Sequence, residues 1–195
     1  GIRIVEGSST DLWRMSADGQ QKALALTGRE PEGTLEDIFA RDGVIWLFDG
    51  VEYAPNLGFG VRTAEVSGAT AVIINVKKTH EERRTIRRAG MRATRFIPVV
   101  YATTEEILSK CNRKIVVAED VGNKAPWETD LTGNLLIVVG AENAGVSREV
   151  LDAASEIVRL PMPGFIPSYN LQVAVSALAI ERLRQIEIVT QNDNP

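Results

Sequence analysis

From Val44 onward, short apolar segments alternate with longer amphipathic ones, and this alternation constrains the fold more than any other feature of the sequence. Segments rich in Val and Ile, typical of strands covered on both faces, occur at 44–48, 71–75, 97–101, 114–119, 135–140 and 156–160. The amphipathic segments predict helices near 56–67, 81–90, 103–110, 147–154 and 169–187. Strands that alternate with helices predict an α/β fold around a parallel sheet.

Length and composition limit the number of domains and the cellular setting. With 195 residues and 44% hydrophobic content, the chain can bury one full core. It has no apolar run of about 18 residues and no signal-peptide pattern at its start, so we expect a soluble protein. Cys111 and His80 are the only cysteine and histidine, which leaves no Cys/His set for zinc. We expect a cytoplasmic protein with a metal-free site.

The expected domain boundaries follow from where the strand and helix pattern is regular. Residues 42–188 carry the regular pattern and form the predicted domain. Residues 1–41 are less regular and are interpreted as an arm or linker, and residues 189–195 are predicted to be a disordered tail.

Basic charge is concentrated in one segment of an acidic chain. The net charge of −4 argues against nucleic-acid binding, but eight of the 22 Lys and Arg residues, and only two of the 26 acidic ones, lie between Lys77 and Arg95. If residues 81–95 are mostly helical, one face carries Arg84, Arg88, Arg92 and Arg95. Such a stripe can contact RNA phosphates, although a solvated helix face is the simpler interpretation of charge alone.

The first motif, PNLGFGVRTAEVSGA at 55–69, follows the strand at 44–48. Asn56 can cap the next helix, and Gly58 and Gly60 let another backbone approach closely. A dinucleotide site fits poorly, because the third glycine of its fingerprint is missing and the second strand is followed by lysines instead of an acidic residue. Arg62, taken alone, is better explained as a surface charge of the helix.

The second and third motifs also combine a turn with a helix. In GAENAGVSREVLDAASEIVRLPMPG at 140–164, Gly140 ends a strand where a ligand can approach, and Glu142 projects from the turn. In PSYNLQVAVSALAIERLRQ at 167–185, Pro167 fixes a turn, Ser168 is a plausible cap, and Asn170 falls in the first helical turn. Capping and loop roles explain each of these residues equally well when it is taken alone.

Together the three motifs resemble those of the SpoU/TrmH branch of the SPOUT RNA 2′-O-ribose methyltransferases, over residues 42–186. The resemblance implies a C-terminal trefoil knot, S-adenosylmethionine as cofactor and a homodimer. It places the apolar stripe Leu171, Val175, Leu178 and Leu183 in the helix that pairs subunits. The chain departs from the family pattern at Tyr169, where leucine is usual, and at Gln172, where serine is common.

The resemblance also implies roles for individual residues. The cofactor-binding positions are Gly140, Leu160, Met162, Tyr169 and Asn170, and the catalytic positions are Asn56, Arg62, Glu142, Ser168 and Asn170. A guanidinium with a pKa above about 12 is a poor base. We therefore expect Arg62 to bind the neighbouring phosphate and to stabilise the developing alkoxide, with the proton leaving to phosphate or water.

The RNA target is predicted from the leader. Residues 20–39 resemble the segment that joins an L30e-like RNA-binding domain to the methylase core in rRNA-type members, so we expect rRNA as substrate and a missing N-terminal domain. Three alternatives stay open: a tRNA 2′-O-methyltransferase of the same family, a nucleotide- or NAD-dependent α/β enzyme, and a catalytically silent RNA-binding relative.

Overall fold

The computed structural model describes residues 31, 33–166 and 168–193. Its centre is a parallel sheet of six strands in the order β3-β2-β1-β5-β4-β6. The strands are β1 Val44–Asp49, β2 Ala71–Ile74, β3 Val99–Tyr101, β4 Lys114–Ala118, β5 Leu135–Gly140 and β6 Glu156–Val158. The predicted α/β class and parallel sheet are confirmed, and each predicted strand is present. The trefoil knot remains what the family resemblance implies.

Helices connect the strands and cover both faces of the sheet. The α-helices are α2 Leu35–Phe39, α3 Ala54–Val66, α4 His80–Ala89, α5 Thr104–Lys110, α6 Arg148–Asp152 and α7 Leu171–Asp193, and the 3₁₀ helices are η1 Ala93–Arg95 and η2 Pro126–Glu128. Capping boxes start α2 at Thr34, α4 at Thr79 and α5 at Thr103. In each box the threonine hydroxyl and an acidic side chain three residues later satisfy free backbone N–H groups.

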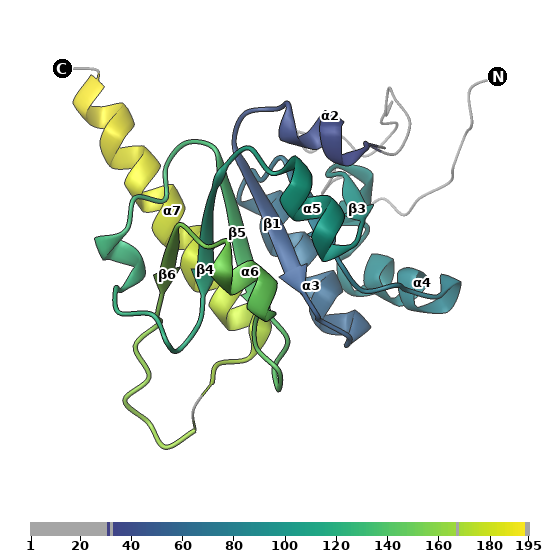
Figure 1. Cartoon of the computed structure of the whole chain (residues 1–195). Coiled ribbons are helices and arrows are strands. Elements are labelled where there is room, and N and C mark those ends of the chain that lie inside the picture. The colour runs from purple at the N-terminus through teal and green to yellow at the C-terminus, as the bar shows by residue number, and fades with distance from the viewer. Residues whose placement is uncertain (1–30, 32, 167, 194–195) are drawn as a thin grey trace, which may run out of the picture.

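The sheet separates two apolar layers (Figure 1). On one face, alternate strand residues such as Trp46, Phe48 and Ile137 pack with α3, α4 and α7. On the other face, residues such as Ile45 and Leu47 pack with α2, α5 and α6. β1 and β5 pair over their full length at the centre, and both are buried on both faces. The buried centre fixes the carboxyl ends of these strands, where polar loops follow.

Both predicted domain boundaries need correction. α2 lies inside the predicted arm 1–41, yet Leu35, Ile38 and Phe39 are buried. Arg113 also donates to the carbonyls of Ile38 and Phe39 at 3.1 and 3.2 Å, which ties this helix to the sheet. At the other end, α7 continues to Asp193, so the prediction of a disordered tail over 189–195 is wrong for those residues. The rest of the arm, residues 1–30 and 32, lies outside the described residues.

The predicted continuous arginine stripe is also wrong in part. Arg84 and Arg88 lie exposed on α4, but this helix ends at Ala89 with Gly90 as its cap. Met91 and Arg92 then adopt positive φ angles of 48° and 62°, and Arg95 lies in the separate helix η1. The left-handed residues turn the chain out of the helix axis, so the arginines do not form one helical row.

The apolar stripe of α7 faces its own sheet. Leu171, Val175 and Leu178 are 4%, 0% and 0% exposed and pack in the core beneath α7. The prediction that this stripe pairs subunits is therefore wrong for these three residues, which the chain's own core covers, whereas the fourth, Leu183, is 39% exposed. α7 also exposes apolar side chains outside the stripe, among them Val173 and Ile180 at 48% and 67%. Within the described residues, no helix is long and apolar enough to cross a membrane.

Candidate active site

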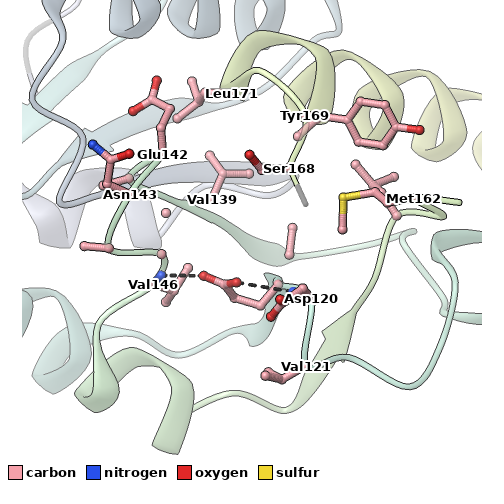
Figure 2. A pocket seen from close by; sticks show the side chains of 18 of the residues that line it. Asp120, Val121, Val139, Glu142, Asn143, Val146, Met162, Ser168, Tyr169 and Leu171 are labelled. Atoms are coloured by element: carbon pink, nitrogen blue, oxygen red, sulfur yellow. Dashed lines mark hydrogen bonds between the residues drawn. The ribbon is translucent and has the colours of Figure 1, made fainter. Parts of the chain in front are cut away.

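A cavity of about 490 Å³ opens at the carboxyl ends of β4 and β5. Most of its lining comes from residues 118–121 at the end of β4, 139–146 at the end of β5, and the loop that leads into α7 (Figure 2). Leu151 of α6 and Leu171 and Ala174 of α7 complete it. The cavity brings together six of the predicted residues, namely Gly140, Glu142, Leu160, Met162, Ser168 and Tyr169. Its apolar walls come from side chains such as Val139, Leu160, Met162 and Leu171.

Gly140 is required by the loop that it precedes. The backbones of Ala141 and Gly145 exchange two hydrogen bonds, of 3.2 and 2.8 Å, which close a tight turn. A Cβ atom on Gly140 would collide with the backbone of Gly145 and Val146. The expectation that glycine here only makes room for a ligand is therefore incomplete, since a larger residue would first displace the turn.

Glu119 holds the same loop from the neighbouring strand, and sequence reasoning missed this role. Its carboxylate accepts hydrogen bonds from the N–H of Val146 at 2.6 Å and of Asp120 at 3.3 Å (Figure 2). A Cβ atom on Gly145 would collide with this carboxylate. An acidic pair directly after a buried strand was the available signal. The adjacent Asp120 also lines the cavity.

Asn56 and Glu142 connect the first motif to the second. The Asn56 side chain, only 9% exposed, donates a hydrogen bond from Nδ2 to the Glu142 carboxylate. Asn56 is not the helix cap that the sequence suggested: α3 begins at Ala54 with Tyr53 at the cap position, and Pro55 occupies the first turn. Asn56 thus lies in the first turn of the helix, where its amide reaches across to the loop after β5.

Asp49 is a second polar residue that the sequence analysis missed. It ends β1, is 1% exposed, and accepts hydrogen bonds from the Ser147 N–H at 2.5 Å and from the Asn75 amide. The side-chain oxygen of Asn75, Oδ1, accepts in turn from the Gly50 N–H at 2.7 Å. This network joins the ends of β1 and β2 to the start of α6, so it fixes the strand ends around the site.

Arg62 and Asn170 lie outside the cavity lining. Arg62 is exposed on α3, and within the described part of the chain its side chain makes no hydrogen bond or ion pair. Asn170 caps α7, since its carboxamide oxygen accepts from the Gln172 N–H at 2.9 Å and its backbone carbonyl accepts from Val173 at 2.9 Å. The cap is therefore Asn170 and not Ser168. Pro167 lies outside the described residues.

Tyr169 closes the loop before α7. Its hydroxyl donates to the Pro161 carbonyl at 2.8 Å, and Figure 2 shows its ring on the same side of the cavity as Met162. The ring is 44% exposed. Tyr169 thus connects the two ends of segment 161–169, and no sequence motif predicted this contact.

Neighbouring side chains and backbone fill the space beside the two glycines of α3. A Cβ atom on Gly58 would collide with α4 at Ala89 and Gly90, and one on Gly60 would collide with the Phe48 ring. The expectation that these glycines allow close approach is confirmed. Because neighbouring protein fills the space beside them, they do not form a dinucleotide cradle.

The comparisons with known proteins agree with this geometry. The model of the SpoU rRNA Methylase family matches residues 43–180. This chain belongs to the SpoU rRNA Methylase family. The match spans the first two motifs of this SpoU chain and the third as far as residue 180, within α7, so the predicted family is confirmed.

Among its relatives, the SpoU chain is 33% identical to the 23S rRNA (guanosine-2′-O-)-methyltransferase RlmB of Pseudomonas putida and 34% identical to that of Pseudomonas aeruginosa. Each match covers 79% of this chain and 65% of the relative, so the chain spans less than two thirds of their length.

Two solved structures extend the comparison. An RNA 2′-O ribose methyltransferase superposes with a TM-score of 0.67 at 29% identity, over 72% of this chain and 55% of the other. An AdoMet-bound rRNA methyltransferase from Sinorhizobium meliloti superposes with a TM-score of 0.73 at 26% identity, over 79% and 61%. The SpoU chain therefore has the fold of these two RNA methyltransferases.

Proposed function

We propose that this chain transfers a methyl group from S-adenosylmethionine to a ribose 2′-hydroxyl of RNA. The observation that carries the proposal is the hydrogen bond from Asn56 to Glu142 at the rim of the cavity. It joins the first motif to the loop that a cofactor would contact. A nucleophile held by α3 would then lie beside a methyl donor held by the loops after β4 and β5.

The cavity suits S-adenosylmethionine in size and lining. Its volume of about 490 Å³ lies within the range of ligand sites, about 300–1,000 Å³. Leu160, Met162 and Leu171 offer apolar surface for an adenine ring, and the turn 141–145 offers backbone polar groups. When bound, this cofactor supplies an electrophilic methyl group on a sulfonium. The comparison that supports this assignment is the AdoMet-bound methyltransferase from Sinorhizobium meliloti.

Arg62 is assigned to the RNA side of the reaction. Its exposed guanidinium lies on the same helix as Asn56 and is available to a phosphate of the substrate. A fixed positive charge next to the 2′-oxygen stabilises the negative charge that develops there. Glu142 holds the Asn56 amide, which then orients the ribose, while Ser168 lines the same cavity. The hydroxyl proton leaves to phosphate or water.

Ribosomal RNA is the proposed substrate, and tRNA is the alternative. The RlmB relatives act, by their names, on 23S rRNA guanosine. Arg84 and Arg88 on α4 form an exposed basic pair that can contact phosphates, and Arg92 and Arg95 extend the basic surface beyond the end of that helix.

We propose a homodimer whose interface is the exposed side of α7, in place of the side that packs on the sheet. The three buried residues of the α7 stripe cannot pair subunits, but Val173, Ala177 and Ile180 are exposed on one side of this helix. They recur at i, i+4 and i+7, which places them in one row. A second copy of the chain would cover this row.

Calorimetric titration tests the cofactor assignment against the dinucleotide alternative. We expect S-adenosylmethionine to bind and NAD not to bind. A Tyr169→Ala variant removes a cavity wall and should weaken the first ligand, whereas Phe59→Ala, on the exposed side of α3 beside the glycines, should not. Binding of NAD that is lost on Phe59→Ala would reject the methylase assignment in favour of a dinucleotide enzyme.

A further inference from the structure

The charged side chains that line the cavity all have the same sign. They are Glu119 and Asp120 after β4 and Glu142 after β5, and the lining contains no lysine, arginine or histidine among the described residues. The cavity therefore presents three carboxylates to whatever it binds. Nothing in the sequence motifs requires this, because the two residues after β4 belong to none of the three motifs.

The three carboxylates have different partners. Glu119 accepts from two backbone N–H groups, and Glu142 accepts from Asn56. Within the described chain, the Asp120 carboxylate accepts no hydrogen bond and pairs with no cation. Figure 2 shows Asp120 and Glu142 on separate segments of the lining. Among the described residues no group of three acidic, histidine or cysteine side chains is arranged to hold a metal ion.

The two forms of the cofactor differ by one unit of charge. S-adenosylmethionine carries a sulfonium, an ammonium and a carboxylate, so its net charge is positive. Transfer forms an O–C bond and breaks the C–S bond, whose electron pair stays on sulfur, while the hydroxyl proton leaves to phosphate or water. The product thioether, S-adenosylhomocysteine, has lost the sulfonium charge and is neutral overall.

We propose that the carboxylates of the lining make this cavity bind the sulfonium cofactor more tightly than its neutral thioether product. Asp120, whose carboxylate holds no other group in place within the described chain, contributes to this preference only by its negative charge. The inference rests on the proposed function, because it concerns the same cavity. Negative charge in a partly enclosed site attracts a cation more strongly than it would in bulk water. The attraction between the carboxylates and the sulfonium ends when the methyl group leaves, because the thioether sulfur carries no charge. The product is therefore released more readily than the cofactor.

The test measures ligand preference and not only affinity. Calorimetry would determine the Kd values of S-adenosylmethionine, S-adenosylhomocysteine and sinefungin, an analogue with an ammonium group in place of the methylated sulfonium, for the whole chain and for Asp120→Asn. We expect Asp120→Asn to weaken both cationic ligands by about threefold to tenfold and to leave the thioether unchanged. High salt should reduce the preference of the unmodified chain for S-adenosylmethionine over S-adenosylhomocysteine, because salt screens the charge of the carboxylates.

Glu105→Gln is the matched control, because it removes one exposed carboxylate from the first turn of α5, which does not line the cavity. It should change none of the three affinities. Equal weakening of all three ligands by Asp120→Asn would overturn the inference, since it would show contact with a group that they share. An unchanged preference would overturn it as well. Failure of every ligand to bind the unmodified chain would instead reject the proposed function.

Discussion

Asn56, in the first turn of α3, donates a hydrogen bond to Glu142, a residue 86 positions later in the chain. This contact joins the helix that carries Arg62 to the turn that lines the cavity. The parallel sheet brings these distant residues together. Because β1 and β5 are neighbouring parallel strands, the segments that follow their carboxyl ends meet at the same edge of the sheet.

Asn56→Ala should remove this contact and leave the Glu142 carboxylate without its amide partner. We expect methyl transfer to fall at least tenfold and the free energy of unfolding to fall by about 1–3 kcal/mol, because a partly buried hydrogen bond is lost. Asn56→Asp is the matched variant: it keeps the size but places two carboxylates together, so it should be at least as damaging. Methyl transfer by Asn56→Asp at the original rate would contradict the role of the amide.

Glu156 predicts a pH dependence of stability. Lys114 pairs with it at 2.6 Å, and Thr129 and Lys124 add hydrogen bonds, which together hold the pKa of the Glu156 carboxyl at about 2. A pKa lowered by folding stabilises the protein above the ordinary value of 4.5. This stabilisation should be lost as the pH falls from about 4.5 towards 2.

Thermal unfolding measured across this acid range checks the Glu156 prediction. Glu156→Gln should lower the melting temperature at neutral pH and should flatten the decline in acid, whereas Glu105→Gln on α5 should do neither. An acid decline of the same size in Glu156→Gln would mean that other carboxyl groups dominate it.

The exposed row on α7 predicts the effect of two substitutions on assembly. Ile180→Glu, at a side chain 67% exposed, should give folded monomers, whereas Leu178→Glu should unfold the chain because Leu178 is fully buried. Sedimentation velocity with circular dichroism distinguishes these results. A monomeric unmodified chain at micromolar concentration would rule out the dimer, and a dimeric Ile180→Glu variant would place the interface elsewhere.

The basic pair on α4 predicts the salt dependence of RNA binding. Replacing Arg84 and Arg88 by alanine should reduce the slope of log affinity against log salt by about 1.4–1.8, at about 0.7–0.9 per phosphate contact. Cofactor affinity should not change. The double variant Arg41→Ala and Lys110→Ala removes the same charge from the opposite face of the sheet and should leave the slope unchanged. Equal slopes in both double variants would show that α4 does not contact RNA.

The sequence predicted the strands and the gathering of polar loops because buried parallel strands have a strong local signature and the motifs follow them directly. It did not predict which side of α7 meets the sheet, since an apolar stripe such as Leu171, Val175 and Leu178 looks the same whether it faces its own core or a partner. The left-handed turn at Met91 and Arg92 was missed because neither residue type favours it. The hydrogen bond from the Val146 N–H to the Glu119 carboxylate was missed because Val146 lies in the loop after a different strand, β5.

Methyl transfer to a ribose hydroxyl, with Arg62 acting on the nucleophile, is the proposed reaction. The direct measurement is transfer of a labelled methyl group from S-adenosylmethionine to purified rRNA and tRNA, followed by nucleoside analysis for 2′-O-methylation. We predict label on rRNA ribose, and for Arg62→Ala a loss of rate equivalent to about 3–4 kcal/mol with cofactor affinity within a few fold. Label on a base, or an Arg62→Ala variant as fast as the unmodified chain, would contradict the account.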